Sequence, residues 1–176
     1  MVINIAFTKM YNQVKYLGQD DRVDKHNPSF PDSLDIKILS ILSEDARTSY
    51  RAIAKKMHVA PGTIYNRIKK MSNDGIIKGY ITLLDYEKLG YGFTALIFLQ
   101  VEGKHLIEIE KQLASLQEVV AVYDITGEFD VVVITRFKNM ESLNSFVKKI
   151  LESPYIKRTV TNVILNVVKE DLRIKI

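Results

Sequence analysis

Residues 47–78 constrain the fold most, because two short amphipathic patterns meet there at a tight turn. In the second pattern, Ile64, Ile68 and Met71 recur at helical spacing, which predicts a helix with one apolar side. The polar positions of the stretch are almost all basic, and Asp74 is its only acid. Two short helices joined in this way, with a basic outer side, are typical of a helix-turn-helix that lays its second helix in the major groove of DNA.

Start and stop signals divide residues 32–75 into three predicted helices. Asp32 and Ser49 can accept hydrogen bonds from free backbone N–H groups, so they are expected to cap the first and second helices. Pro61 is favoured at a first helical position, and Gly75 is a typical helix-stop residue. The apolar positions of the three helices predict one small core, made of Leu34, Ile38, Ile41, Leu42, Tyr50, Ile53, Ala54, Met57, Ile64, Ile68 and Met71.

The outward side of the predicted third helix mixes cations with side chains that can read base edges. An asparagine such as Asn66 can bond both N6 and N7 of adenine, which is worth about 1–3 kcal/mol of discrimination. Lysine and arginine suit phosphates, which supply affinity and position rather than sequence choice. A glycine at position 62 permits a close approach of backbone and duplex. The predicted DNA-binding residues are Arg51, Gly62, Thr63, Tyr65, Asn66, Lys69 and Lys70.

The excess of positive over negative charge lies in this region. The formal net charge is +4, and residues 31–82 alone hold nine basic and five acidic side chains, which accounts for the whole excess. A basic module beside a near-neutral one indicates an anionic partner for the first and a different role for the second. The alternative is a solvated basic surface on an ordinary three-helix bundle. The helix lengths, the short turn and the isolated charge excess together favour double-stranded DNA as the partner.

From residue 93 onward the hydrophobic period changes, and runs rich in valine and isoleucine alternate with segments of helical spacing. The resulting order is β-α-β-β-α-β, so the chain is expected to be α+β, with a ferredoxin-like (ACT-like) βαββαβ domain after the winged helix-turn-helix. The second face of such a sheet would carry enough valine and isoleucine to need a second subunit. The expected elements are strand 93–101, helix 105–116, strand 119–126, strand 131–137, helix 139–151 and strand 159–168.

These patterns divide the chain into four segments. Residues 76–82 are expected to be β-rich and to form a wing or the start of a linker. Pro28 and Pro31 interrupt any helix near the N-terminus, which leaves a disordered tail and an ordered arm that packs on a partner subunit as open alternatives. The predicted segments are an arm or leader at 1–31, a winged helix-turn-helix DNA-binding domain at 32–82, a linker at 83–92 and an oligomerisation and effector-binding domain at 93–176.

Several classes of function lack the residues that they need. The chain contains no cysteine, which excludes disulfides, thiolate catalysis and thiolate metal sites. The histidines His26, His58 and His105 are far apart and show no metal spacing, and no phosphate loop or dinucleotide fingerprint occurs. No apolar run approaches the roughly 20 residues that span a bilayer, and residues 1–7 are too short for a signal peptide. We expect a cytoplasmic protein that is not an enzyme and has no cofactor, metal or membrane partner.

The stretch LDIKILSILSEDARTSYRAIAKKMHVAPGTIYNRIKKMSNDGIIKGY resembles the N-terminal half of the Lrp/AsnC family, the leucine-responsive and feast/famine regulators. The segments ITGEFDVVV and KRTVTNVIL resemble the effector domain of the same family, so the likeness covers about residues 32–170. Two positions depart from the family pattern. The turn position, often glycine, is His58, and the usual serine cap of the third helix is Ala60, which removes one capping bond of about 1 kcal/mol. The most similar positions are Asp35, Ile38, Leu39, Leu42, Asp45, Ala46, Arg47, Ile53, Ala54, Arg67, Ile68, Gly75, Ile76, Ile77, Lys78, Gly79 and Tyr80.

The resemblance implies a C-terminal domain that pairs through its sheet into homodimers, which assemble into tetramers or octamers. It also implies a small effector, usually an amino acid, that binds between dimers at the glycine turn. A glycine at position 127 bares backbone amides that can hold a carboxylate, and Glu128 or Asp130 can hold an ammonium group. A plain β-turn with a buried Phe129 is the alternative that needs no ligand. The implied effector-binding residues are Thr126, Gly127, Glu128, Phe129, Asp130, Thr159 and Thr161.

Two other functions stay open beside a sequence-specific regulator with an amino-acid effector. One is an architectural DNA-binding protein without an effector. The other is an enzyme similar to the siroheme decarboxylases, which share this two-domain fold, although the scattered histidines and the basic third helix disfavour a tetrapyrrole pocket. The carboxylates Asp124, Glu128 and Asp130 could also be a paired acid–base site, but they flank a turn and are better explained as solvated loop charges.

Overall fold

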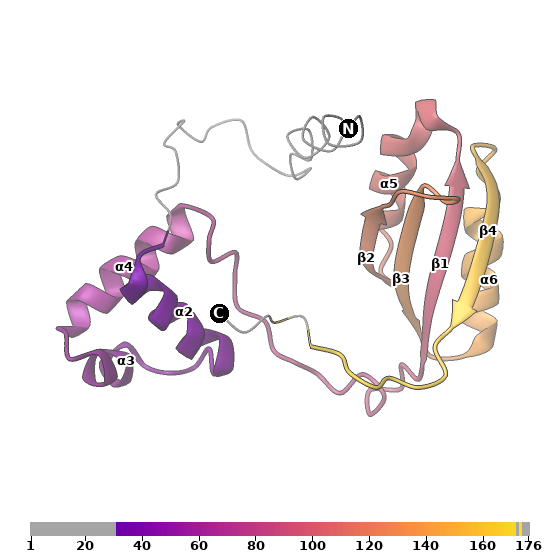
Figure 1. Cartoon of the computed structure of the whole chain (residues 1–176). Coiled ribbons are helices and arrows are strands. Elements are labelled where there is room, and N and C mark those ends of the chain that lie inside the picture. The colour runs from indigo at the N-terminus through magenta and orange to yellow at the C-terminus, as the bar shows by residue number, and fades with distance from the viewer. Residues whose placement is uncertain (1–30, 172, 174–176) are drawn as a thin grey trace. The chain divides into compact units, whose positions relative to one another are not determined.

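The computed structural model describes residues 31–171 and 173, so the predicted arm at 1–31 lies outside the described residues except for Pro31. The chain divides into two compact units, and the division falls between Gly79 and Tyr80 (Figure 1). None of the described helices has the length and apolar composition that crossing a bilayer requires.

The N-terminal unit consists of three helices whose ends follow the predicted capping signals. Asp32 accepts hydrogen bonds from two backbone N–H groups of the first helix and forms a capping box with Asp35. Ser49 caps the second helix, and the third begins at Pro61 without a side-chain cap, as predicted. The helices are α2 (Ser33–Glu44), α3 (Tyr50–Met57) and α4 (Pro61–Asn73).

The core of this unit is the predicted one with a single clear exception. Seven apolar side chains are buried together, namely Ile38, Leu42, Ile53, Ala54, Ile64, Ile68 and Met71. The prediction that Tyr50 faces this core is wrong, because Tyr50 is 42% exposed. It lies on the first turn of α3, and its ring is 6.1 Å from the ring of Tyr65 between centroids. Helical spacing therefore placed Tyr50 in the core, but spacing within one helix could not show that the neighbouring helices leave this residue exposed.

An ion pair between distant residues holds the start of α2 against the middle of α4. The guanidinium of Arg67 donates to Asp32 and, at 3.2 Å from Nη1, to Asp35. The hydrogen bond from Arg67 lowers the pKa of the Asp32 carboxyl, and the same bond raises the pKa of Arg67. Arg67 is a basic residue of the predicted third helix, but its guanidinium forms ion pairs within the unit and stabilises its fold.

The predicted β-rich segment at 76–82 forms no strand, which corrects that expectation. Gly75 has a φ of +72°, and after it the backbone amides of Ile76 and Ile77 donate to the carbonyl of Met71 at 2.9 and 3.1 Å. Both isoleucines pack against the three-helix core. A strand needs a neighbouring strand as its hydrogen-bonding partner, and the four described strands all belong to one sheet in the second unit.

The C-terminal unit is an antiparallel sheet of order β2-β3-β1-β4, which confirms the ferredoxin-like βαββαβ prediction. The predicted bounds of the last strand, 159–168, are wrong. The strand begins at Ile156 and ends at Val163. Its final bond joins the Ile164 amide to the Thr94 carbonyl, and β1 offers no partner beyond that point. The elements are β1 (Phe93–Val101), a 3₁₀ turn (Gly103–His105), α5 (Leu106–Ala114), β2 (Val119–Asp124), β3 (Val131–Phe137), α6 (Met140–Ile150) and β4 (Ile156–Val163).

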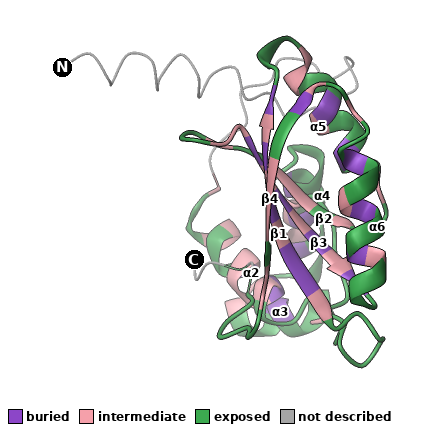
Figure 2. Cartoon of the chain, turned by 90° about the vertical axis from the view of Figure 1, so that its right-hand side faces the viewer, coloured by how far each residue is buried: buried purple, intermediate pink, exposed green. Residues whose placement is uncertain are grey.

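The two faces of the sheet differ in what covers them. Helices α5 and α6 lie on the same face, and their buried residues face the strands (Figure 2). Burial alternates along β1 and β3, so every second side chain enters this core. On the other face, no helix of the described unit covers the sheet. The half-buried apolar side chains of that open face include Leu96, Phe98, Val132, Ile134 and Val160.

The predicted linker at 83–92 contains a folded turn that packs on the sheet. The amide of Tyr91 donates to the carbonyl of Tyr86 at 2.8 Å, which closes the turn. The ring of Tyr86 lies 4.4 Å from the guanidinium carbon of Arg136 on β3. The same guanidinium donates to both carboxylate oxygens of Glu170, at 2.6 and 2.7 Å. Arg136 therefore binds segments from before β1 and after β4 to one end of the sheet.

Candidate DNA-binding surface and effector loop

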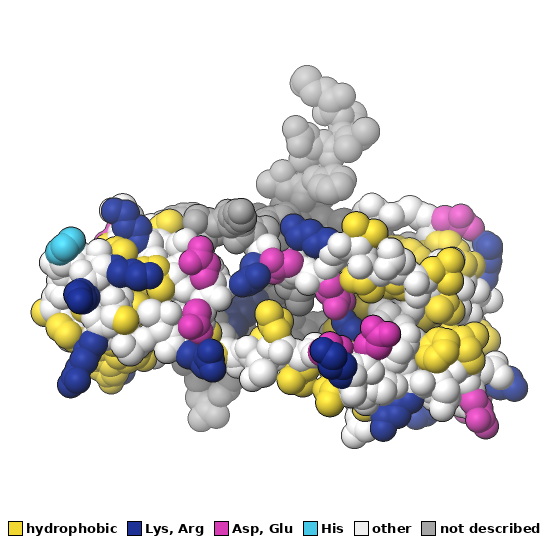
Figure 3. Space-filling view, turned by 90° about the horizontal axis from the view of Figure 1, so that it is seen from below, with side chains coloured by type: hydrophobic (Ala, Val, Ile, Leu, Met, Phe, Trp, Pro, Cys, Tyr) yellow, Lys and Arg dark blue, Asp and Glu magenta, His cyan; other side chains and the backbone are white. Residues whose placement is uncertain are grey.

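The predicted DNA-binding side chains lie on the side of α4 and α3 that the core leaves exposed. Ile64, Ile68 and Met71 occupy the buried side of α4, so the polar positions of the helix point outward. Lys and Arg side chains are spread over the surface of this unit, at the left of Figure 3. Of the predicted set, Thr63 is half-buried and the others are exposed, namely Arg51, Gly62, Tyr65, Asn66, Lys69 and Lys70.

The turn before α4 is built without glycine. His58 ends α3 in a left-handed conformation with a φ of +55°, which histidine tolerates better than β-branched residues do. The next amide, of Val59, donates to the carbonyl of Ala54 at 3.1 Å, and the valine side chain packs against the core. The glycine that is common at this position in the family is therefore not needed for this tight turn.

Gly62 lies in open space on the first turn of α4. A Cβ at this position would meet no atom within 4 Å beyond the adjoining residues and backbone of its own helix, and the residue has no positive φ. The fold itself therefore does not require glycine there. A partner molecule that approaches the backbone closely at this position would explain why the residue is glycine.

An aromatic pair adjoins the cations of this surface. The ring of Tyr65 has two neighbours, namely the ring of Tyr50, at 6.1 Å between centroids, and the Lys69 ammonium, at 5.9 Å from the centroid of Tyr65. Tyr65 was among the predicted residues, whereas Tyr50 was missed because its spacing assigned it to the core. The only sequence signal for it is its place at the first turn of α3, next to Arg51.

The predicted effector loop joins β2 to β3, and its backbone is tightly held. Gly127 has a φ of +128°, which side-chain-bearing residues rarely adopt. The amide of Ile125 donates to the carbonyl of Asp130 at 2.8 Å and closes the loop. The Asp130 carboxylate accepts a hydrogen bond from the Val101 amide at 2.8 Å, so this side chain already has a partner that fixes the end of β1.

One cation lies against this loop that sequence reasoning did not include. Arg158 on β4 donates to the Glu128 carboxylate at 2.7 Å, and its guanidinium carbon is 5.4 Å from the Phe129 ring centroid. Phe129 in turn lies 5.7 Å from Phe98, which belongs to the open face of the sheet. The signal for Arg158 was present in the segment KRTVTNVIL, but only the strand register showed that it reaches the loop.

The two predicted threonines do not join this group within one chain. Thr159 pairs with Leu99 and Thr161 pairs with Ile97, and both partners are fully buried on the helix-covered face. Directly paired residues in an antiparallel sheet point to the same face, so both threonines point away from Phe129. Thr126 is exposed on the loop.

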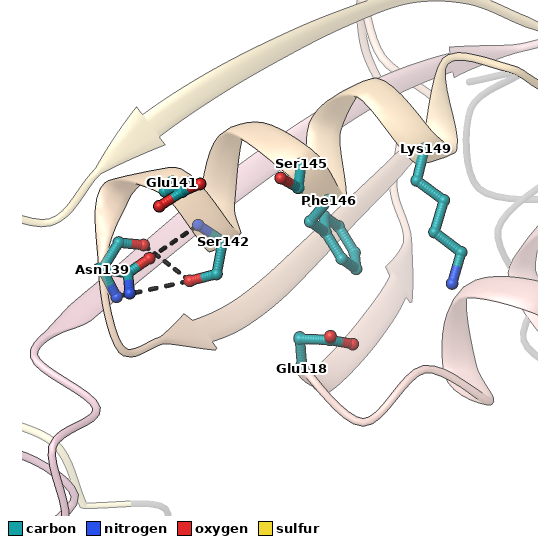
Figure 4. A pocket seen from close by; sticks show the side chains of 7 residues that line it. All are labelled: Glu118, Asn139, Glu141, Ser142, Ser145, Phe146 and Lys149. Carbon is teal, nitrogen blue, oxygen red and sulfur yellow. Dashed lines mark hydrogen bonds between the residues drawn. The ribbon is translucent and has the colours of Figure 1, made fainter.

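The structure also contains a hollow that the sequence did not indicate, with a volume of about 430 Å³. Figure 4 shows that Asn139 and Ser142 are joined by the hydrogen bonds that cap α6. The hollow lies at the start of β2 and along α6, away from the glycine turn, and is lined by Glu118, Asn139, Glu141, Ser142, Ser145, Phe146 and Lys149. Among the described residues, no group of three or more His, Asp or Glu side chains could hold a metal ion.

Comparison with known families matches both units of the chain. Residues 31–78 match the winged helix-turn-helix DNA-binding family model, and residues 94–174 match the Lrp/AsnC ligand-binding domain. An uncharacterised HTH-type transcriptional regulator of Pyrococcus furiosus is 51% identical over 144 residues, which are 82% of this chain and 97% of that protein.

Solved structures are also similar to this chain. Escherichia coli AsnC is 31% identical, with a TM-score of 0.76 over 82% of this chain and 97% of that one. A transcriptional regulator of Neisseria meningitidis, solved in complex with L-Met, is 26% identical, with a TM-score of 0.74 over 80% and 94% of the two chains. The relatives are regulators, so the enzyme alternative is set aside. From its two domains and these relatives, the chain is a member of the Lrp/AsnC family of DNA-binding transcriptional regulators.

Proposed function

We propose that the chain regulates transcription by laying α4 in the major groove of specific operators, where Asn66 reads a base and Arg51, Lys69 and Lys70 contact phosphates. The observation that carries this proposal is the exposed polar and cationic side of α4 opposite its buried Ile64, Ile68 and Met71. A helix of 13 residues is long enough to present several side chains to base edges and backbone together. The protein works in the cytoplasm in this proposal.

Asn66→Ala is expected to weaken binding to an operator about tenfold or more, since a good side-chain contact to a base is worth about 1–3 kcal/mol. The operator is obtained by selecting bound fragments from a random-sequence pool with the wild-type protein, and affinity is measured by gel-shift titration. Asn144→Ala is the matched control, because Asn144 is exposed on α6 of the other unit. Unchanged affinity for the operator in the Asn66 variant would defeat the assignment of base reading to this residue.

We further propose that two copies pair through the open face of the sheet and that the dimers assemble into tetramers or octamers. Leu96, Phe98, Val132, Ile134 and Val160 leave contiguous apolar surface on that face. Apolar surface of this kind on a soluble protein is a typical site of association. Paired recognition helices would then contact two half-sites, as dimeric helix-turn-helix proteins do.

The ligand in this proposal is a free α-amino acid that binds at the glycine turn. Such a molecule carries a carboxylate and an ammonium group on one carbon, and the Glu128–Arg158 ion pair offers the complementary charges 2.7 Å apart. Arg158 would take the carboxylate, Glu128 the ammonium, and the Phe129 ring the side chain. In this proposal Asp130 does not bind the ammonium group, because its carboxylate already accepts a hydrogen bond from the Val101 amide. The L-Met bound to the regulator of Neisseria meningitidis supports this ligand class.

Glu128→Gln is expected to weaken binding of the amino acid about tenfold or more, because a hydrogen bond to a charged group is worth about 1.5–3 kcal/mol. Isothermal titration calorimetry of the wild type with each of the standard amino acids first identifies the ligand. Glu141→Gln, which removes the same charge from an exposed site on α6, is the control. Equal affinity of the Glu128 and Glu141 variants would show that Glu128 does not bind the ligand.

An architectural role is the second candidate function, favoured by the basic surface of the N-terminal unit. Phosphate contacts alone give binding that depends steeply on salt and little on sequence. Failure to enrich any sequence from the random pool, together with no heat from any amino acid, would favour this role over regulation.

A further inference from the structure

Two neighbouring tyrosine rings are exposed on the proposed DNA-binding side of the N-terminal unit. Among residues 31–79, the large apolar side chains that remain exposed are Ile36, Tyr50 and Tyr65, at 39%, 42% and 48%. The two tyrosines belong to different helices, α3 and α4, and their rings are 6.1 Å apart with an interplanar angle of 57°. This geometry is within the range of attractive aromatic pairs. The pair therefore forms one apolar patch within a polar and basic surface.

The ring of Tyr65 has two neighbouring side chains that favour its position. Tyr50 lies against it from α3, and the Lys69 ammonium lies 5.9 Å from its centroid from the next turn of α4. Cations within about 6 Å of an aromatic face are attracted to it. A side chain that is already restrained in the free protein loses less conformational freedom on binding.

Thymine offers an apolar group that suits such a ring. In the major groove the base edges present hydrogen-bond donors and acceptors, and only thymine adds a methyl group there. Tyr65 and Asn66 are consecutive exposed positions of α4, so the ring and the side chain proposed to read adenine lie on the same turn of the helix. We propose that Tyr65 contacts the 5-methyl group of thymine and that Tyr50 is a positioning residue that holds the Tyr65 ring. This inference rests on the proposed placement of α4 in the major groove.

The proposal is tested with a duplex selected from a random-sequence pool by the wild-type protein, in which each thymine is replaced in turn by uracil. The replacement removes only the methyl group and needs no protein variant. We expect at least one position to lose about fourfold in affinity, as burial of one methyl group implies. Tyr65→Ala should bind the thymine and uracil duplexes equally. Selected sites without thymine, unchanged affinity for every uracil duplex, or an equal uracil effect in Tyr65→Ala would each overturn the proposal.

The role of Tyr50 is tested by a double-mutant cycle on the same duplexes. Tyr50→Ala should reduce the preference for thymine over uracil, and adding it to Tyr65→Ala should cost no further affinity, because the ring that it positions is gone. Tyr50→Phe keeps the ring contact and should retain the preference. Ile36→Ala, an exposed apolar side chain on α2, is the control and should bind as the wild type does. Losses that multiply in the double variant would overturn the positioning role.

The outcomes separate this inference from the function on which it rests. If Asn66→Ala weakens binding while all uracil duplexes bind normally, the aromatic pair has no reading role and the regulator assignment of α4 stands. If the wild-type protein does not bind double-stranded DNA at low salt, both proposals fail together.

Discussion

Simultaneous replacement of Arg51, Lys69 and Lys70 by alanine is expected to weaken binding to double-stranded DNA by roughly 100-fold or more. All three side chains are exposed, Arg51 on α3 and Lys69 and Lys70 on α4. Hydrogen bonds to charged groups contribute about 1.5–3 kcal/mol each when a partner is bound. Each lost phosphate contact should also lower the slope of log affinity against log salt by about 0.9. The expected change in slope is therefore close to three for each DNA-binding domain.

The measurement is fluorescence anisotropy of a labelled operator at salt concentrations between about 50 and 200 mM, where the slope is steep. A matched control removes three lysines from the C-terminal unit, Lys104, Lys111 and Lys148, which are also exposed. Both variants lose the same formal charge, so a general attraction between protein and DNA would fall equally in both. If the control lost as much affinity as the α3–α4 variant, the binding surface would lie elsewhere or be spread over the whole molecule.

Features that depend on neighbouring residues in the chain were predictable from the sequence. The caps Asp32 and Ser49 and the start of α4 at Pro61 follow from the chemistry of free N–H groups at helix ends, and the structure has all three. The order of strands and helices along the C-terminal unit, β-α-β-β-α-β, followed from the alternation of two hydrophobic periods. These signals act within a few residues, so they are visible in the order of the amino acids alone.

Features that depend on distant parts of the chain were missed or misassigned. Arg67 pairs with acids more than 30 positions earlier, and nothing local distinguishes it from the exposed lysines of the same helix. Arg158 reaches Glu128 only because β4 lies beside β1 in one particular register. The same register places Thr159 on the helix-covered face, whereas the sequence could not choose between faces. A change of register by one residue would move the side chains of β4 to the opposite face of the sheet.

Ile64→Ala is expected to cost the N-terminal unit about 2–5 kcal/mol, the range for truncating a large buried aliphatic side chain. Ile64 is fully buried in a cluster of only seven buried residues. Small domains have a narrow margin of stability, so this loss should unfold the unit at moderate temperature or abolish its fold. The core of the C-terminal unit contains no residue from α4, and it should therefore stay folded while DNA binding disappears.

Differential scanning calorimetry of the full chain separates these effects, because two units with separate cores should give two transitions. In Ile64→Ala the transition of the helical unit should move down or vanish, while that of the β-containing unit stays in place. Ile36→Ala deletes the same atoms from an exposed position on α2 and should cost far less. A single transition that shifts as a whole would show that the two units unfold as one, and the loss of DNA binding could then not be assigned to the three-helix core alone.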